Sequence, residues 1–251
     1  MAKVDEVDVN LPTATVASSP KGSATNPTHQ RLLDAAVRLF STKGFHGVGI
    51  RELANTAGLS TASLYHYMGT KERLLFQIMH DSLERLNVAA ETIATNCPDA
   101  RDRLAMLVRM HVVTHALQRD ASVVVDNEIR ALEPGDRLVI VKQRDTYEEY
   151  WAQAIAEGVE SGFFSVPDQH AARLSLLEMC SGVARWFSID GPQSVSEISE
   201  IYADLAANLL NVHDPRDRSK QATSLDIRSL VEKVWAFAIP DTDEKHANSA
   251  S

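Results

Sequence analysis

The chain has 251 residues, of which 44% are hydrophobic and 24% charged, and its formal net charge at pH 7 is −9. This composition is ordinary for a soluble globular protein, and the sparse glycine and missing strand alternation predict an all-α fold. No apolar run approaches the ~20 residues that span a bilayer, and Cys97 and Cys180 alone indicate no disulfide framework, so we expect a reduced, cytoplasmic protein.

The first element in chain order is an irregular arm, and the second is a helix. Residues 1–26 are rich in Ser, Thr, Ala and Pro without periodicity, which predicts disorder. Asn26 and Pro27 then suit the N-cap and first turn of a helix whose apolar stripe runs to Gly44. Thr28 lies in the first turn of that helix, where backbone amides can meet a phosphate.

Residues 49–71 hold two short helical patterns around a glycine-centred turn. Gly58 suits the left-handed residue that ends the first helix, and Ser60 suits the N-cap of the second, which runs from 61 to about 68. The first pattern places four apolar residues at helical spacing: Ile50, Leu53, Ala54 and Ala57. Leu64 points inward on the second helix and leaves most of its other side chains outside the core. This layout is that of a helix-turn-helix.

These residues resemble the TetR family of transcriptional repressors. The matching pieces are Ala54, Ala57-Gly58-Leu59-Ser60, Leu64-Tyr65-His66-Tyr67, and Lys71 followed by Leu74-Leu75. Gly49, Ala62 and Met68 depart from the usual family pattern, and we expect the flexible Met68 to fill the same core gap. The resemblance implies a ligand-responsive repressor rather than an enzyme. It would bind a near-palindromic double-stranded DNA operator as a homodimer and need no cofactor beyond a small-molecule effector.

The resemblance also implies that the second helix of the motif reads DNA. Thr61 and Ala62 would approach base edges, whereas the tyrosines, Lys71 and Arg51 would contact the backbone. The full set of expected DNA-contacting residues is Thr28, Arg51, Ser60, Thr61, Ala62, Ser63, Tyr65, His66, Tyr67 and Lys71. Core packing is the alternative for Tyr65 and Tyr67. Charge agrees weakly with DNA binding, since residues 27–75 carry a balance of +3 and residues 76–251 one of −11.

The rest of the chain is predicted to form a larger helical domain. Thr70 caps a long helix that ends near 96–98, and further helices are predicted from 99, over 121–132, 136–161, 169–187 and 194–212, the last with a capping box of Ser194 and Glu197. The resemblance implies that the last two helices form a four-helix dimer interface, and packing within one subunit is the alternative. The predicted domains are a helix-turn-helix domain at 27–73, a ligand-binding and dimerisation domain at 74–212, and 213–251.

The last of these parts contains a polar link and an extra amphipathic helix at 225–239. We expect this helix to dock on its own subunit or across the dimer, where it would cover apolar surface. Recruitment of another protein is the alternative, and it would make the chain a helical adaptor.

An effector site is expected among the helices from about 74 to 187. Tyr147, Tyr150 and Trp151 would line an apolar cavity, with Arg109, Asn127, Arg130 or Arg185 as polar anchors. An ordinary core or surface role is the alternative for each of them. The segment 126–130 and the helix after it resemble TetR-family regulators of lipid and steroid catabolism, which implies an apolar or acyl-CoA-like effector whose phosphates pair with arginines.

A histidine pair raises one competing function. His111 and His115 lie four residues apart on a predicted helix, where they would bind a metal together with Glu128 or Asp126. A lone pair at this spacing is a weak signal, so we expect no metal. A helical metal-dependent hydrolase is the resulting alternative, and loss of a bound metal on His111→Ala would be its signature.

Overall fold

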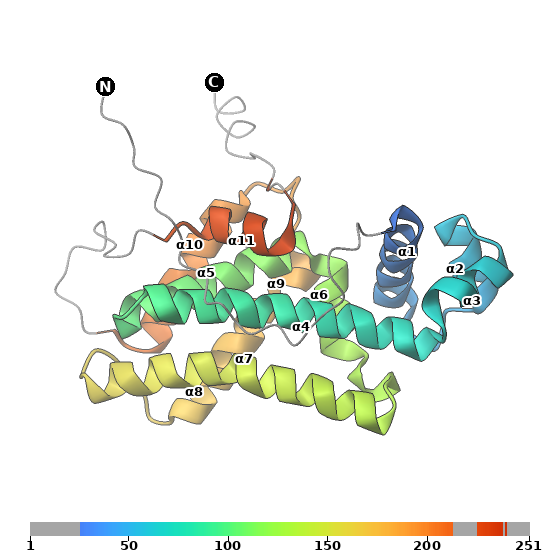
Figure 1. Ribbon diagram of the computed structural model, residues 1–251. Coiled ribbons are helices and arrows are strands. Elements are labelled where there is room, and N and C mark those ends of the chain that lie inside the picture. Colours follow the sequence, from blue (N-terminus) through green and yellow to red (C-terminus); the bar gives the residue numbers. More distant parts are fainter. Residues whose placement is uncertain (1–25, 213–224, 238, 240–251) are drawn as a thin grey trace, which may run out of the picture. The chain divides into compact units, whose positions relative to one another are not determined.

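The computed structural model describes residues 26–212, 225–237 and 239, and each regular element in these ranges is helical (Figure 1). The predicted all-α class is confirmed. The arm predicted for 1–26 lies outside the described residues except for Asn26, and so does the predicted link at 213–224. No helix in the described ranges is long and apolar enough to cross a membrane.

The helices follow one another without long irregular connections in the described part of the chain. Their bounds are α1 Pro27–Lys43, α2 Ile50–Ala57, α3 Thr61–Met68, α4 Lys71–Asn96, α5 Ala100–Leu117, α6 Arg119–Asn127, the 3-10 turn η1 Ile129–Ala131, α7 Pro134–Glu160, α8 Gln169–Ser181, α9 Val183–Trp186, α10 Val195–Leu209 and α11 Ile227–Trp235.

Packing divides the described residues into two compact units. One contains 26–85 and 118–146, and the other contains 86–117 and the residues from 147 onward. The dividing points fall inside α4 and α7, so each of these long helices contributes to both units. The domain limits expected from the sequence, 27–73 and 74–212, remain a prediction.

The unit that contains the helix-turn-helix is organised around α1. Asn26 caps this helix, because its side-chain oxygen accepts the Thr28 backbone N–H at 3.0 Å. The buried side of α1 packs against α2 and α3 and also against α6, from a distant part of the sequence. It is formed by Leu32, Ala35, Ala36, Leu39 and Phe40.

The other unit is organised around α5, whose residues are buried on nearly every side. Helices α8, α9, α10 and α11 all contact it. Helix α11 contacts α5 and buries Leu230, Val231 and Trp235, so it packs on its own chain, which is one of the two dockings expected for the extra C-terminal helix.

Three of the predicted helices have wrong boundaries. The helix predicted to start at 136 already starts at Pro134, because a proline at the first helical position needs no N–H partner. The helix predicted over 169–187 breaks at Gly182 into α8 and α9, where glycine lowers helix propensity. The segment predicted as 121–132 starts at Arg119 and ends in the tighter turn η1.

Candidate functional site

The turn between α2 and α3 has the local geometry that the sequence predicts. Gly58 has a φ of +67°, and its backbone N–H satisfies carbonyls at the end of α2. Ser60 Oγ then accepts the Ser63 backbone N–H at 3.1 Å and so caps α3. Leu64 and Met68 are buried and fix α3 to its unit, which confirms the inward position expected for both.

The remaining side chains of α3 form an outward row. Thr61, Ala62, Tyr65 and His66 are exposed, whereas Ser63 and Tyr67 are half-buried. Tyr65 keeps 51% of its surface exposed, so it is not a core residue. The Tyr67 ring meets the His66 ring edge-on at 5.3 Å. A short helix held by two apolar anchors thus presents small polar groups and aromatic rings to its surroundings.

Lys71 follows α3 but is engaged inside its own unit. Its Nζ donates to the carbonyl oxygens of Phe45 at 2.8 Å and Val48 at 2.9 Å, and it lies 4.1 Å from the centre of the Phe45 ring. Two of the three ammonium donors are therefore committed to the loop between α1 and α2. One donor remains for the predicted phosphate contact, which the exposed Arg51 on α2 can make without such competition.

A buried polar cluster lies in the other unit. His111 Nδ1 shares a hydrogen bond with the Tyr147 hydroxyl at 2.8 Å, and His111 Nε2 shares one with Ser181 Oγ at 3.0 Å. The His115 ring stacks on His111 at 3.8 Å, and the fully buried Trp151 meets His111 edge-on at 5.6 Å. The two hydrogen bonds of the His111 imidazole therefore link α5 to α7 and to the C-terminal end of α8.

Burial sets the charge state of this cluster. Desolvation lowers the pKa of His111 well below 6.5, and the neighbouring His115 lowers it further. Desolvation also lowers the pKa of His115 to about 4. Both imidazoles are therefore neutral at pH 7, and burial raises the pKa of the Tyr147 hydroxyl above its ordinary range. The cluster is a neutral hydrogen-bonding group inside an apolar core.

The structure brings together only some of the residues predicted for the effector. Tyr147 and Trp151 lie in the buried cluster, while Tyr150 is half-buried and Arg185 is exposed on α9. Asn127 and Arg130 are exposed residues of the unit that contains the helix-turn-helix.

Arg109 is engaged by an acidic side chain. Its Nε and Nη2 donate to the two Glu200 carboxylate oxygens at 2.7 and 2.8 Å, which ties α5 to α10. Sequence reasoning missed this pairing, and it also missed Ser181 as a partner of His111. The signal available for the cluster was the placement of two histidines within the largely apolar stretch 110–117 of α5.

Two family models match the chain over most of its described length. The model of bacterial regulatory proteins of the tetR family matches residues 32–78, and the tetracyclin repressor-like C-terminal domain matches residues 97–210. The crystal structure of the TetR-family regulator PfmR from Thermus thermophilus is 32% identical, with a TM-score of 0.64 over 73% of this chain and 99% of that one. The chain belongs to the TetR family.

Other relatives lie within this family. The HTH-type transcriptional repressor KstR2 of Rhodococcus jostii is 26% identical over 176 residues, which cover 69% of this chain and 86% of that protein. AibR, solved with isovaleryl coenzyme A and operator DNA, shares the fold at 22% identity, with a TM-score of 0.65 over 74% of this chain and 100% of that one. This TetR-family chain is a DNA-binding transcriptional repressor and not an enzyme, so the hydrolase alternative is wrong.

Proposed function

We propose that the protein binds a near-palindromic operator as a homodimer and is released from it by an apolar or acyl-CoA-like effector. In a two-fold dimer, the two copies of α3 would enter successive major grooves about one DNA turn, ~34 Å, apart. The single observation that carries the proposal is the outward row of α3, where Thr61, Ala62 and Tyr65 are exposed beside two buried anchors.

The DNA contacts would divide by chemistry. Hydroxyl and methyl groups of Thr61 and Ala62 suit base edges in the major groove. Arg51, Lys71, the two tyrosines and the first turn of α1 at Thr28 suit the phosphate backbone, and Ser60, Ser63 and His66 complete the surface. Phosphate contacts would position the repressor, while the contacts of α3 would select the sequence.

The dimer is supported by apolar side chains that one subunit leaves exposed. On α8 and α10 these are Leu174, Ile201, Leu205 and Leu209, each between 38% and 44% exposed. Large exposed apolar patches are uncommon on monomeric proteins and mark interaction surfaces. A second copy that presents the same two helices would cover them and form a four-helix interface.

The effector part of the proposal rests on the unit that contains α5. Tyr147 and Trp151 supply aromatic surface there, and Tyr150 lies one turn away from Tyr147. The relative AibR was solved with isovaleryl coenzyme A. The match to the repressor KstR2 favours the group expected from the sequence, the TetR-family regulators of lipid and steroid catabolism. Of the predicted arginine anchors, Arg185 is the exposed one in this unit and would meet a CoA phosphate, since Arg109 would first have to leave Glu200. If the dimer has two conformations that differ in the distance between the two α3 helices, an effector that binds one of them more tightly would shift the equilibrium toward that conformation.

The operator can be found and tested with the full-length protein. Selection from a random duplex pool should enrich a near-palindrome. Thr61→Lys should abolish the preference for it, whereas Tyr65→Ala should weaken binding to all duplexes. Arg51→Ala should lower affinity for all duplexes and reduce the salt slope by about one. Lys142→Ala removes another exposed cation, from α7, and is the matched control. Full sequence preference in the Thr61→Lys variant would show that α3 does not read the DNA.

The effector can be tested separately on the selected operator. Isovaleryl-CoA and longer acyl-CoA thioesters should release the protein from DNA, whereas free coenzyme A should not. Release by none of these thioesters would refute the acyl-CoA class and leave operator binding intact.

A further inference from the structure

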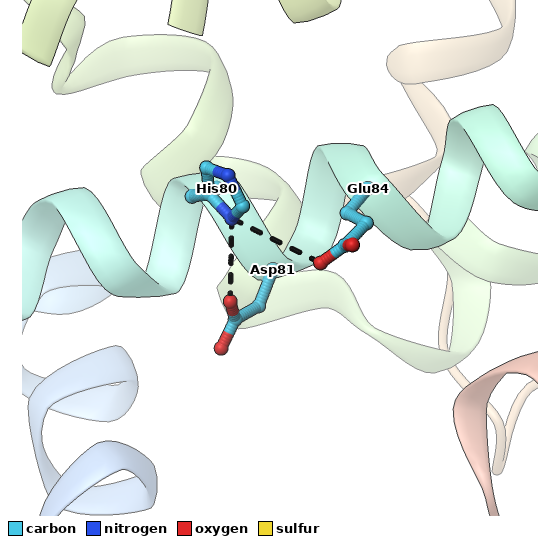
Figure 2. A group of neighbouring side chains, drawn as sticks. All are labelled: His80, Asp81 and Glu84. Carbon is cyan, nitrogen blue, oxygen red and sulfur yellow. Dashed lines mark ion pairs between the residues drawn. The ribbon is translucent and has the colours of Figure 1, made fainter. Parts of the chain in front are cut away.

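A histidine and two carboxylates meet on one stretch of α4, outside the surfaces described so far. His80, Asp81 and Glu84 lie next to one another on this helix (Figure 2). His80 Nδ1 lies 3.5 Å from Asp81 Oδ1 and 3.9 Å from Glu84 Oε2, and one ligand atom from each residue lies within 4.8 Å of the others. Residues four apart share a helix face, so the spacing itself brings His80 and Glu84 together.

Within the part of the chain that the structure describes, neither carboxylate of this group pairs with a lysine or arginine. Among the described residues, the ion pairs of Asp81 and Glu84 are with His80 alone. Two carboxylates this close repel each other, and a neutral imidazole leaves both charges uncompensated. A divalent cation would balance both.

We propose that His80, Asp81 and Glu84 form a binding site for a zinc-class divalent transition metal ion. Imidazole nitrogen and carboxylate oxygen are both zinc ligands, and bonds of 2.0–2.2 Å in a tetrahedral site place ligand atoms ~3.3 Å apart. The separations of 3.5 and 3.9 Å from His80 Nδ1 are already close to that value. The imidazole favours a transition metal over magnesium or calcium, which prefer oxygen ligands alone.

The exposure of the three side chains fits an ion that keeps bound water. The side chains of His80, Asp81 and Glu84 are 34%, 41% and 63% exposed. Three protein ligands leave at least one coordination position open, and water can reach it from the surface. Because the ligands lie about one turn apart on a single helix, the bound ion would stabilise that turn of α4. Metal should therefore raise the thermal midpoint of the protein.

The test uses full-length protein that has been treated with EDTA and dialysed free of it. Titration with Zn²⁺ in a calorimeter should show one ion per chain at this site, and Co²⁺ should give the absorption bands of a low-coordinate complex. His80→Ala and Glu84→Gln should each weaken binding at least about tenfold, since even the loss of outer-shell partners costs 10–100-fold. His46→Ala, which removes an exposed imidazole elsewhere in the same unit, should bind as the wild type does.

Two results would overturn the site. One is the absence of Zn²⁺ binding to the wild-type chain, and the other is binding that His80→Ala and Glu84→Gln leave unchanged. Circular dichroism of each variant checks its fold, and the partly exposed Glu84 makes the Gln variant the safer of the two. Competition by Mg²⁺ at equal concentration would refute the transition-metal class. This experiment measures neither operator binding nor effector release, so its outcome is distinct from that of the tests of the proposed function.

Discussion

At the scale of single residues, two cations that the sequence assigns to the same task lie in different surroundings. Arg51 is exposed on α2, whereas Lys71 donates to the Phe45 and Val48 carbonyl oxygens. The sequence does not distinguish their roles. Lys71 has the same position relative to the motif whether its ammonium group binds loop carbonyls or a phosphate. Only the path of the loop before α2 brings the two carbonyls to Lys71.

Replacing Lys71 should therefore destabilise the protein as well as weaken DNA binding. Lys71→Met leaves two carbonyl groups without their charged donor, which should lower the free energy of unfolding by about 1–3 kcal/mol. Arg51→Ala should leave stability within about 0.5 kcal/mol of wild type. Urea denaturation of both variants checks this, and equal stability of Lys71→Met and wild type would contradict the role of Lys71 in the loop.

The buried histidines predict a dependence of stability on pH. Burial holds the pKa of His115 at about 4, while an unfolded histidine keeps a pKa near 6.5. Between these values the unfolded chain binds more protons, so stability present above pH 6.5 is lost as the pH falls toward 4. The full loss for one such group is about 3 kcal/mol.

A variant isolates this contribution from that of the carboxylates, which titrate in the same range. His115→Gln keeps an N–H donor for the His111 carbonyl oxygen, which His115 Nδ1 contacts at 2.9 Å, but binds no proton. Its free energy of unfolding should fall less steeply than that of the wild type between pH 6.5 and pH 4. Parallel curves in thermal denaturation would mean that His115 accepts a proton in the folded protein.

At the scale of elements, the helix starts that a capping side chain marks were predicted well because capping is local, whereas the starts of α6 and α7 were not. Asn26, Ser60, Thr70 and Asp168 each accept a backbone N–H in the first turn of the helix that they precede. The ends were predicted less well, since glycine and proline bias a helix without deciding where it stops. Gly182 is an example. Its backbone keeps a right-handed helical conformation, and yet α8 ends just before it and α9 begins just after it.

The capping box of α10 gives a prediction at this scale. Ser194 Oγ accepts the Glu197 backbone N–H at 3.1 Å, and the Glu197 side chain accepts the Ser194 N–H at 2.7 Å. Ser194→Ala should lower the free energy of unfolding by about 1 kcal/mol. Ser196→Ala on the exposed side of α10 should have little effect. Equal chemical denaturation midpoints for the two variants would contradict a stabilising cap.

At the scale of the whole molecule, the main prediction concerns assembly. Leu205 is 44% exposed on α10, and a glutamate there would place a charge in the proposed four-helix interface. Leu205→Glu should convert the dimer into a folded monomer that binds the operator weakly, and sedimentation velocity measures this. The control is Leu138→Glu, because Leu138 is 71% exposed on α7, outside α8 and α10. A Leu205→Glu protein that sediments as the wild type does would place the interface elsewhere.

The sequence by itself determined the helical class, the helix-turn-helix and its caps. These depend on residues within one or two turns of each other: Gly58 and Ser60 set the turn, and Leu64 and Met68 set the inward side of α3. The tertiary structure alone decided which distant groups meet. The pairing of Arg109 with Glu200, the join of His111 to Tyr147 and Ser181, and the packing of α1 on α6 all link residues far apart in the chain. Helical periodicity gives the side of a helix that is buried, but the neighbour that covers it follows only from the packing of the whole chain.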